Sequence, residues 1–210
     1  MIDDLVHATS LSLRVSLAST GLAAVIGIPA GTWLGSSGFR GRRAVVVLTN
    51  TMMAMPTVLV GLLVYAFLSR QGPLGMLGLL YTPTAMIAGE SLLALSLLVA
   101  LSRGAVENLD LRARETAVTL GASRGRTILV LAREASPAIG AAVLSAFGRV
   151  VSELGIALMV GGNIRGETRT LTTSMTLATA RGDFELAAAL GGVLLVVAFG
   201  VVLTAELLRR

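Results

Sequence analysis

The chain has 210 residues, of which 54% are hydrophobic and 14% are charged, and its formal net charge is +5. A composition this apolar along the whole length is typical of a membrane protein and excludes an ordinary soluble globule. All seventeen basic residues are arginines that lie beside apolar runs, which argues against a nucleic-acid-binding module and excludes a P-loop, because a P-loop needs lysine.

Five apolar runs are long enough to cross a bilayer as helices, since about 20 residues suffice. They are Leu11 to Leu34, Ala44 to Leu68, Thr84 to Ser102, Pro137 to Val160 and Leu186 to Leu207. In the first run, Gly27 and Gly31 are four residues apart, so they either allow close helix packing or belong to a glycine-tolerant membrane helix that Pro29 kinks. We therefore predict an all-α integral membrane protein with five transmembrane helices.

The second run contains the sequence MMAMP, which includes Met55 and Pro56. Proline frees a backbone carbonyl and bends a membrane helix, and methionine packs adaptably beside it. These two residues either line a translocation path or serve only in packing. The run is followed by a Gly/Pro-rich loop, 70–83, which we expect to lie on the membrane surface or to dip into the membrane. A second loop, 161–185, is polar and rich in threonine.

A polar segment lies between the third and fourth runs and carries five arginines within 112–134. We predict two short helices here, Leu109 to Leu120 and Arg124 to Arg133. Gly121 can take the left-handed conformation that ends a helix, and Ser123 can cap the next one. The whole segment, 103–136, is expected to form a helical elbow outside the bilayer, because its charges need water or a soluble partner.

The arginines predict the orientation of the spans. One side has Arg40, Arg42, Arg43, the six arginines from Arg103 to Arg133, Arg209 and Arg210. The other has Arg14, Arg70, Arg165, Arg169 and Arg181, diluted by Asp3, Asp4, Glu167, Asp183 and Glu185. The positive-inside rule places the first side in the cytoplasm, with the N-terminus outside and the C-terminus inside. The acidic N-terminus lacks the features of a cleaved signal, so we expect the first run to be retained.

Arg149 and Glu153 lie within the fourth run, four residues apart and hence on one face of a helix. Charges at this depth are costly unless they are paired or face water. Either this face, with Arg149 and Glu153, lines a translocation path along which Arg149 draws an anion, or Arg149 forms a structural ion pair, with Glu153 or with Glu90 of the third run. Similarly, Gly155, Gly161 and Gly162 either expose amide groups to an oxyanion or end the helix tightly.

Catalytic chemistry has little support in this chain. There is no cysteine, His7 is the single histidine, and no cluster of metal ligands or catalytic side chains is evident. We therefore expect no enzyme activity, no bound metal and no cofactor, and any ATP must be bound by a partner.

The polar segment resembles the EAA loop of ABC-importer permeases in its Glu115-Thr116-Ala117 sequence, followed after three residues by Gly121. It departs from that pattern where Arg133 and Glu134 stand in place of Leu-Pro. Stretches 57–87 and 152–195, especially GGNIRGETRTLTT, resemble tungstate-type permeases. Together these resemblances cover most of the chain and imply a MetI-like type I permease core over 8–207, in the cytoplasmic (inner) membrane of a prokaryote.

The resemblance also implies partners and roles. The chain would form a homodimer, bind two ATPase subunits that carry ATP and Mg²⁺ in the cytoplasm, and receive an oxyanion from an extracytoplasmic binding protein. Tungstate is the expected substrate and molybdate the next, with sulfate, phosphate or another anion as weaker candidates and a non-ABC channel or scaffold as the alternative class. Gly121 and Ser123 would shape the coupling loop, and Glu115 would hold its two helices together. Ala117, Leu120 and Ala122 would present an apolar knob to the ATPase.

Overall fold

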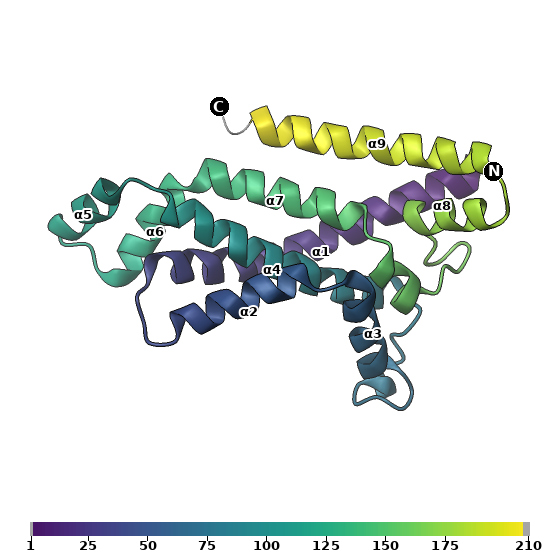
Figure 1. Ribbon diagram of the computed structural model, residues 1–210, viewed down its shortest axis with the longest axis horizontal. Coiled ribbons are helices and arrows are strands. Elements are labelled where there is room, and N and C mark those ends of the chain that lie inside the picture. The colour runs from purple at the N-terminus through teal and green to yellow at the C-terminus, as the bar shows by residue number, and fades with distance from the viewer. Residues whose placement is uncertain (1, 208–210) are drawn as a thin grey trace.

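The computed structural model describes residues 2–207, and every regular element in that range is helical (Figure 1). Three helices are long and apolar enough to cross a membrane alone: α1 (Ile2–Ser36), α4 (Pro83–Glu107) and α9 (Phe184–Leu207). Two bent helix pairs raise the number of candidate spans to five if each pair is one span. They are Arg42–Ala54 with Thr57–Leu68 and Arg124–Glu134 with Ser136–Val151. Arg209 and Arg210, which contributed to the predicted orientation, lie outside the described residues.

Helices α1 and α4 pack closely along most of their length, and glycines on α1 make this possible. A Cβ atom on Gly31 would lie 2.6 Å from the carbonyl oxygen of Val99, and one on Gly27 would lie 3.0 Å from Cβ of Leu98. A Cβ atom on Gly35 would lie 2.8 Å from the carbonyl oxygen of Arg103. The predicted use of Gly27 and Gly31 in close packing is confirmed, and Pro29 lies within α1 without ending it.

The second apolar run differs from the continuous span that we expected. It forms α2 (Arg42–Ala54) and α3 (Thr57–Leu68), whose axes differ in direction by 97°. The break is at Met55 and Pro56, where Met55 is extended with φ −65° and ψ 140°. Proline disfavours a helical conformation in the residue before it and has no N–H to donate, so the chain turns instead of bending gently.

The polar elbow consists of α5 (Leu111–Thr119) and α6 (Arg124–Glu134). The next helix, α7 (Ser136–Val151), leaves α6 at an angle of 68°. It ends nine residues before the predicted limit of Val160, and the run continues as a turn and a short π-helix, η2 (Ala157–Gly161). The fourth run is therefore also interrupted.

A further helix, α8 (Leu171–Ala180), lies in the segment that we expected to be a loop. Thr170 begins it with a reciprocal capping box: its hydroxyl accepts from the Thr173 amide, and the Thr173 hydroxyl accepts from the Thr170 amide. Loop 69–82, in contrast, is irregular as predicted, apart from one turn of 3₁₀ helix, η1 (Gly75–Leu77).

The elements give the molecule two distinct ends. The elbow of α5 and α6 lies at one end, and the start of α1, α8 and the start of α9 lie at the other (Figure 1). Helix α8 packs against α9 around Leu171, Ala178 and Leu190, which are buried. The rest of α9 is mostly uncovered by other helices: only 11% of its most apolar stretch is buried.

Candidate functional site

The turn of the elbow is built around Gly121, as predicted. Its φ is +77°, the left-handed region that favours glycine. The amide of Ala122 donates to the carbonyl oxygen of Ala117 at 3.0 Å, and the amide of Gly121 donates to that of Val118 at 2.9 Å. These two bonds are the Schellman motif, which satisfies the last carbonyl groups of α5 and reverses the chain.

The two helices of the elbow begin at polar residues, but only one is capped by its side chain. Asp110 accepts a hydrogen bond from the Arg112 amide at 2.9 Å, so α5 begins at Leu111 rather than at Leu109. Ser123 occupies the N-cap position of α6, where its side chain makes no capping bond. Its contribution to α6 is its carbonyl oxygen, which accepts from the Thr127 amide at 2.9 Å.

The outer surface of the elbow is apolar at its tip. Leu120 is 82% exposed and Val118 is 57% exposed, whereas Ala122 is half-buried. Ala117 is only 6% exposed, because it faces the inside of the turn, so it does not form part of an exposed knob as we had expected. Val118, which we did not predict, lies at this tip because it points away from the buried side chain of Ala117, one residue before it.

Glu115 also differs from the expectation that it ties the two helices together. Its side chain is exposed, and within residues 2–207 its carboxylate makes no hydrogen bond or ion pair. The Schellman hydrogen bonds connect α5 to the turn instead. The carboxylate is therefore open to solvent or to another protein.

The elbow is attached to the rest of the molecule by a small apolar cluster, in which Leu131 of α6 packs with Val106 of α4 and Ile139 of α7. Next to it, Arg42 at the start of α2 forms an ion pair with Glu107, near the end of α4. The Arg42 Nε also donates to the carbonyl oxygen of Leu34 on α1, at 3.0 Å. The ends of α1, α2 and α4 are thus connected beside the elbow.

Arg149 and Glu153 form the ion pair that their spacing suggested. The distance from Arg149 Nη1 to Glu153 Oε2 is 2.9 Å. Since α7 ends at Val151, Glu153 lies just beyond the helix rather than on its face. The side chain of Glu153 is 2% exposed and that of Arg149 is 46% exposed, so the pair has one buried and one open member.

The carboxylate of Glu153 also organises the turn that follows α7. Its Oε1 accepts from the amides of Gly155 at 2.8 Å and Ile156 at 3.3 Å, as a helix-capping carboxylate does. The backbone oxygen of Glu153 accepts from the hydroxyl of Thr172 on α8 at 2.9 Å. The Gly155 amide is consequently used within the chain and is not available to an oxyanion.

The other two glycines of that stretch shape the backbone. Gly161 faces Met86, where a Cβ atom would lie 2.8 Å from the sulfur, and Gly162 has φ +71°. The close approach of Gly161 to Met86 and the positive φ of Gly162 support the interpretation that these glycines end the π-helix tightly.

Glu90 is a second buried carboxyl group and lies on α4, 3% exposed. Within the described part of the chain its side chain is bonded only to the hydroxyl of Ser19 on α1, at 3.4 Å, and it has no cation within ion-pair distance. The alternative of an Arg149–Glu90 pair is therefore not seen.

The structure brings the break at Met55 and Pro56 close to the turn after Glu153. A Cβ atom on Gly155 would lie 2.8 Å from the hydroxyl of Thr57 and 2.9 Å from the amide of Val58, at the start of α3. Two interruptions that are far apart in the sequence thus meet at one place. Non-helical backbone at membrane depth is tolerated where it is buried in protein or lines a water-filled cavity.

Within residues 2–207 no group of His, Cys, Asp and Glu side chains is arranged to hold a metal ion.

Comparison with known proteins gives a consistent result. Residues 27–207 match the family described as binding-protein-dependent transport system inner membrane component. The chain is 40% identical to the tungstate uptake system permease protein of Peptoclostridium acidaminophilum, over 91% of this chain and 84% of that protein. It is 42% identical to a probable anion ABC transporter permease protein of Haloferax volcanii, over 94% and 87% of the two chains.

The fold matches solved permease structures as well. An inward-facing structure of the MetNI methionine ABC transporter superposes on the whole of this chain and on 98% of its own chain, with a TM-score of 0.80. The identity there is 18%, so this likeness concerns the fold alone.

Proposed function

We infer the function from the family to which this chain belongs, the inner membrane components of binding-protein-dependent transport systems, and propose that it is the permease subunit of an ATP-driven oxyanion importer. The observation that carries this proposal is the 40% identity, over 91% of the chain, to a tungstate uptake permease. The protein is an integral component of the inner membrane.

Tungstate is the proposed substrate and molybdate the second candidate. The two are tetrahedral dianions of nearly the same size, and the binding protein usually selects between such anions before the permease receives them. The similarity to a probable anion permease supports the broader class and keeps sulfate and phosphate as weaker candidates.

Three kinds of partner follow from this role: a second copy of the chain, two cytoplasmic ATPase subunits and an extracytoplasmic binding protein. ATP and Mg²⁺ belong to the ATPases, because this chain lacks the lysine of a P-loop. No cofactor is assigned to the permease itself.

The elbow is the proposed contact with the ATPase. Leu120 and Val118 supply an exposed apolar tip, and the exposed carboxylate of Glu115 lies on α5, which ends at this tip. Gly121, Ala122 and Ser123 hold the turn that presents them. Hydrophobic contacts at the centre of an interface, surrounded by polar groups, give most of its stability.

The proposed translocation path passes the half-exposed guanidinium of Arg149 and the break at Met55 and Pro56. Glu153 is proposed as a structural support of this path, because the oxygens of the Glu153 carboxylate already accept hydrogen bonds from Arg149 and two backbone amides.

Uptake of labelled tungstate, in cells with and without this chain, tests the proposal. We expect uptake to fall when the chain is removed, and unlabelled molybdate to compete much better than sulfate. Unchanged tungstate uptake would remove the substrate assignment and leave the permease class to be tested with other anions.

A passive channel or membrane scaffold is the alternative class of function. Purification of the tagged chain in mild detergent separates the two, because an importer permease brings a P-loop ATPase with it. A Leu120→Asp variant should lose that ATPase while keeping the yield of the wild-type permease, since Leu120 is 82% exposed. Retention of the ATPase by this variant would place the contact elsewhere.

A further inference from the structure

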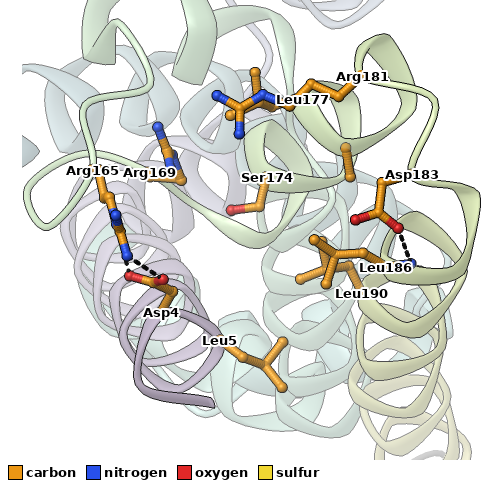
Figure 2. Close-up of a pocket in the computed structure, with 11 residues that line it drawn as sticks. Asp4, Leu5, Arg165, Arg169, Ser174, Leu177, Arg181, Asp183, Leu186 and Leu190 are labelled. Atoms are coloured by element: carbon orange, nitrogen blue, oxygen red, sulfur yellow. Dashed lines mark hydrogen bonds and ion pairs between the residues drawn. The ribbon is translucent and has the colours of Figure 1, made fainter. Parts of the chain in front are cut away.

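A pocket at the end of the molecule opposite the elbow contains three arginines that the transport proposal does not use. It has a volume of about 360 Å³ and is formed by the start of α1, the loop before α8, α8 itself and the start of α9 (Figure 2). This volume would hold roughly ten water molecules. A tetrahedral oxyanion therefore fits together with part of its hydration shell. The cationic residues that line the pocket are Arg165, Arg169 and Arg181.

Two of these arginines are held in place by hydrogen bonds. Arg165 makes a two-pronged ion pair with Asp4 on α1, with Nε–Oδ1 and Nη2–Oδ2 distances of 3.0 and 2.7 Å (Figure 2). The Asp4 carboxylate raises the pKa of the Arg165 guanidinium. Arg169 donates from Nε to the side-chain oxygen of Asn163 at 3.1 Å, and from Nη2 to its backbone oxygen at 3.3 Å.

The loop that carries Arg165 and Arg169 is itself tightly bonded. The amides of Glu167, Thr168 and Arg169 all donate to the carbonyl oxygen of Ile164, at 3.0–3.2 Å. The Ile164 amide donates in turn to the hydroxyl of Thr168, which is fully buried. An ordered loop positions its arginines without a further entropy loss when a ligand binds.

The third arginine and a nearby hydroxyl remain available. Arg181 is exposed, and within residues 2–207 its guanidinium makes no hydrogen bond or ion pair. The hydroxyl of Ser174 also has no partner among those residues, and it points toward the side of the pocket where Arg169 lies (Figure 2). Asp183, which lines the pocket just before α9, has one oxygen engaged by the Leu186 amide at 3.1 Å.

The floor of the pocket is apolar and includes Leu5, Leu177 and Leu190. Electrostatic attraction is stronger beside such a surface than in bulk water, because the local dielectric constant is lower. Guanidinium groups match the geometry of tetrahedral oxyanions, to which they donate paired hydrogen bonds.

We propose that this pocket binds a tetrahedral oxyanion at the extracytoplasmic mouth of the permease, with Arg181, Arg169 and Ser174 as its donors. Arg165, whose charge is compensated by Asp4, joins the loop before α8 to α1 and so shapes the pocket. The proposal rests on the proposed function, since the elbow must face the cytoplasm for the pocket to face outside. The site would hold the anion after the binding protein releases it and before it moves toward Arg149. Phosphate headgroups of lipids share this chemistry, so the test must separate the two sources.

The test uses the complete permease–ATPase complex in nanodiscs of neutral phosphatidylcholine, without the binding protein. Tungstate binding is measured by equilibrium dialysis and elemental analysis. We expect saturable binding, and we expect Arg181→Gln to weaken it roughly ten-fold or more, as loss of a charge-assisted hydrogen bond predicts. Arg181→Lys keeps the charge without the paired donors, so it should weaken binding by a smaller factor.

Arg70→Gln is the matched control, because Arg70 is an exposed arginine on the same predicted face and outside this pocket. It should bind tungstate as the wild type does. Equal affinity for Arg181→Gln and wild type would overturn the proposal. So would a wild-type complex that transports tungstate in the presence of the binding protein but binds none in its absence, and in that case the proposed function would stand.

Three further outcomes would also overturn the site. If the wild-type complex neither transports nor binds tungstate, the proposed substrate and the site fail together. If the complex in a second set of nanodiscs, which contain anionic phosphatidylglycerol, binds that lipid at Arg181 and tungstate does not bind, the pocket is a lipid headgroup site. If Arg181→Gln weakens only the association with the binding protein, the arginines form a docking surface.

Discussion

At the scale of single residues, Gly121 is the position where the backbone conformation of the elbow most clearly requires glycine. A residue with a side chain pays about 1–2 kcal/mol in the left-handed region. We expect Gly121→Ala to leave membrane insertion intact but to reduce coupling of ATP hydrolysis to transport, because the Schellman turn no longer holds Leu120 in position. The ratio of ATP hydrolysed to anion transported, measured in proteoliposomes, is the appropriate quantity.

Gly125→Ala provides the control for this prediction. Gly125 lies four residues away within α6, without a positive φ, and no atom would lie within 4 Å of the added Cβ. The same chemical change should therefore be neutral or slightly stabilising there. If both alanine variants couple normally, the geometry of the turn is not what transmits the movement.

The ion pair of Arg149 and Glu153 allows a second prediction at this scale. Arg149→Met leaves Glu153 without its charged partner, so loss of uptake could come either from an unpaired carboxylate or from loss of a positive charge on the path. The double variant Arg149→Met with Glu153→Gln removes the first cause, since glutamine can still accept from the Gly155 amide.

If Arg149 acts on the anion, we expect the double variant to assemble at wild-type levels and to transport at less than roughly a tenth of the wild-type rate, the loss that removal of a charge-assisted contact predicts. Assembly is read from the yield of intact complex and transport from tungstate uptake. Restored uptake in the double variant would show that the arginine serves only to neutralise Glu153.

At the scale of elements, the contact between α1 and α4 depends on glycines that have no room for a side chain. Gly31→Ala would place a Cβ atom 2.6 Å from the carbonyl oxygen of Val99, and overpacking of this kind typically costs about 1–3 kcal/mol. We expect this variant to lower the melting temperature of the purified permease. Gly21→Ala, on the same helix with no neighbour within 4 Å, should not.

Helix positions were predictable from the sequence where hydropathy alone decides them. Of the interruptions, the sequence predicted a bend at Pro56 but not its size, and it did not predict the break after α7. The run Leu11 to Leu34 lies entirely within α1, because nothing in it removes more than one backbone hydrogen bond. A hydropathy profile does not reveal the turn at Pro56 or the turn after α7 that Glu153 caps. Both turns interrupt an apolar run without making its sequence polar.

Helix α8 was missed for the opposite reason, because its threonines make an apolar-faced helix look like a loop. Its capping box, Thr170 with Thr173, was the available signal. In the candidate site, Gly121 was predictable because only glycine takes its φ readily. The arginine pocket was not, since it joins Asp4 to residues more than 160 positions away in the chain.

At the scale of the whole molecule, the predicted orientation of the chain in the membrane can be tested directly because the sequence has no cysteine. Single cysteines can be placed at exposed positions and labelled in intact cells with a membrane-impermeant maleimide. We expect Glu167→Cys to react from outside and Ser123→Cys to react only after permeabilisation. The reverse pattern would invert the topology and would place the arginine pocket in the cytoplasm.

The same method decides whether the bent pair of α2 and α3 crosses the membrane as one span. Gly38→Cys lies before α2 and Gln71→Cys follows α3. If the pair is a span, only Gln71→Cys should react from outside. Labelling of both, or of neither, would identify a re-entrant segment and reduce the number of spans.

The close packing of α1 against α4 also has a mechanical consequence. Helix α4 has 25 residues, hence a length of about 37 Å, and its last turn lies beside the elbow. Two rods joined by backbone-to-backbone contact along their length resist bending, so a tilt applied at one end reaches the other. A rotation of about 5° would move the far end by roughly 3 Å over a helix of that length. Such a lever turns a small displacement at the elbow into a shift of one atomic diameter at the opposite end of the molecule.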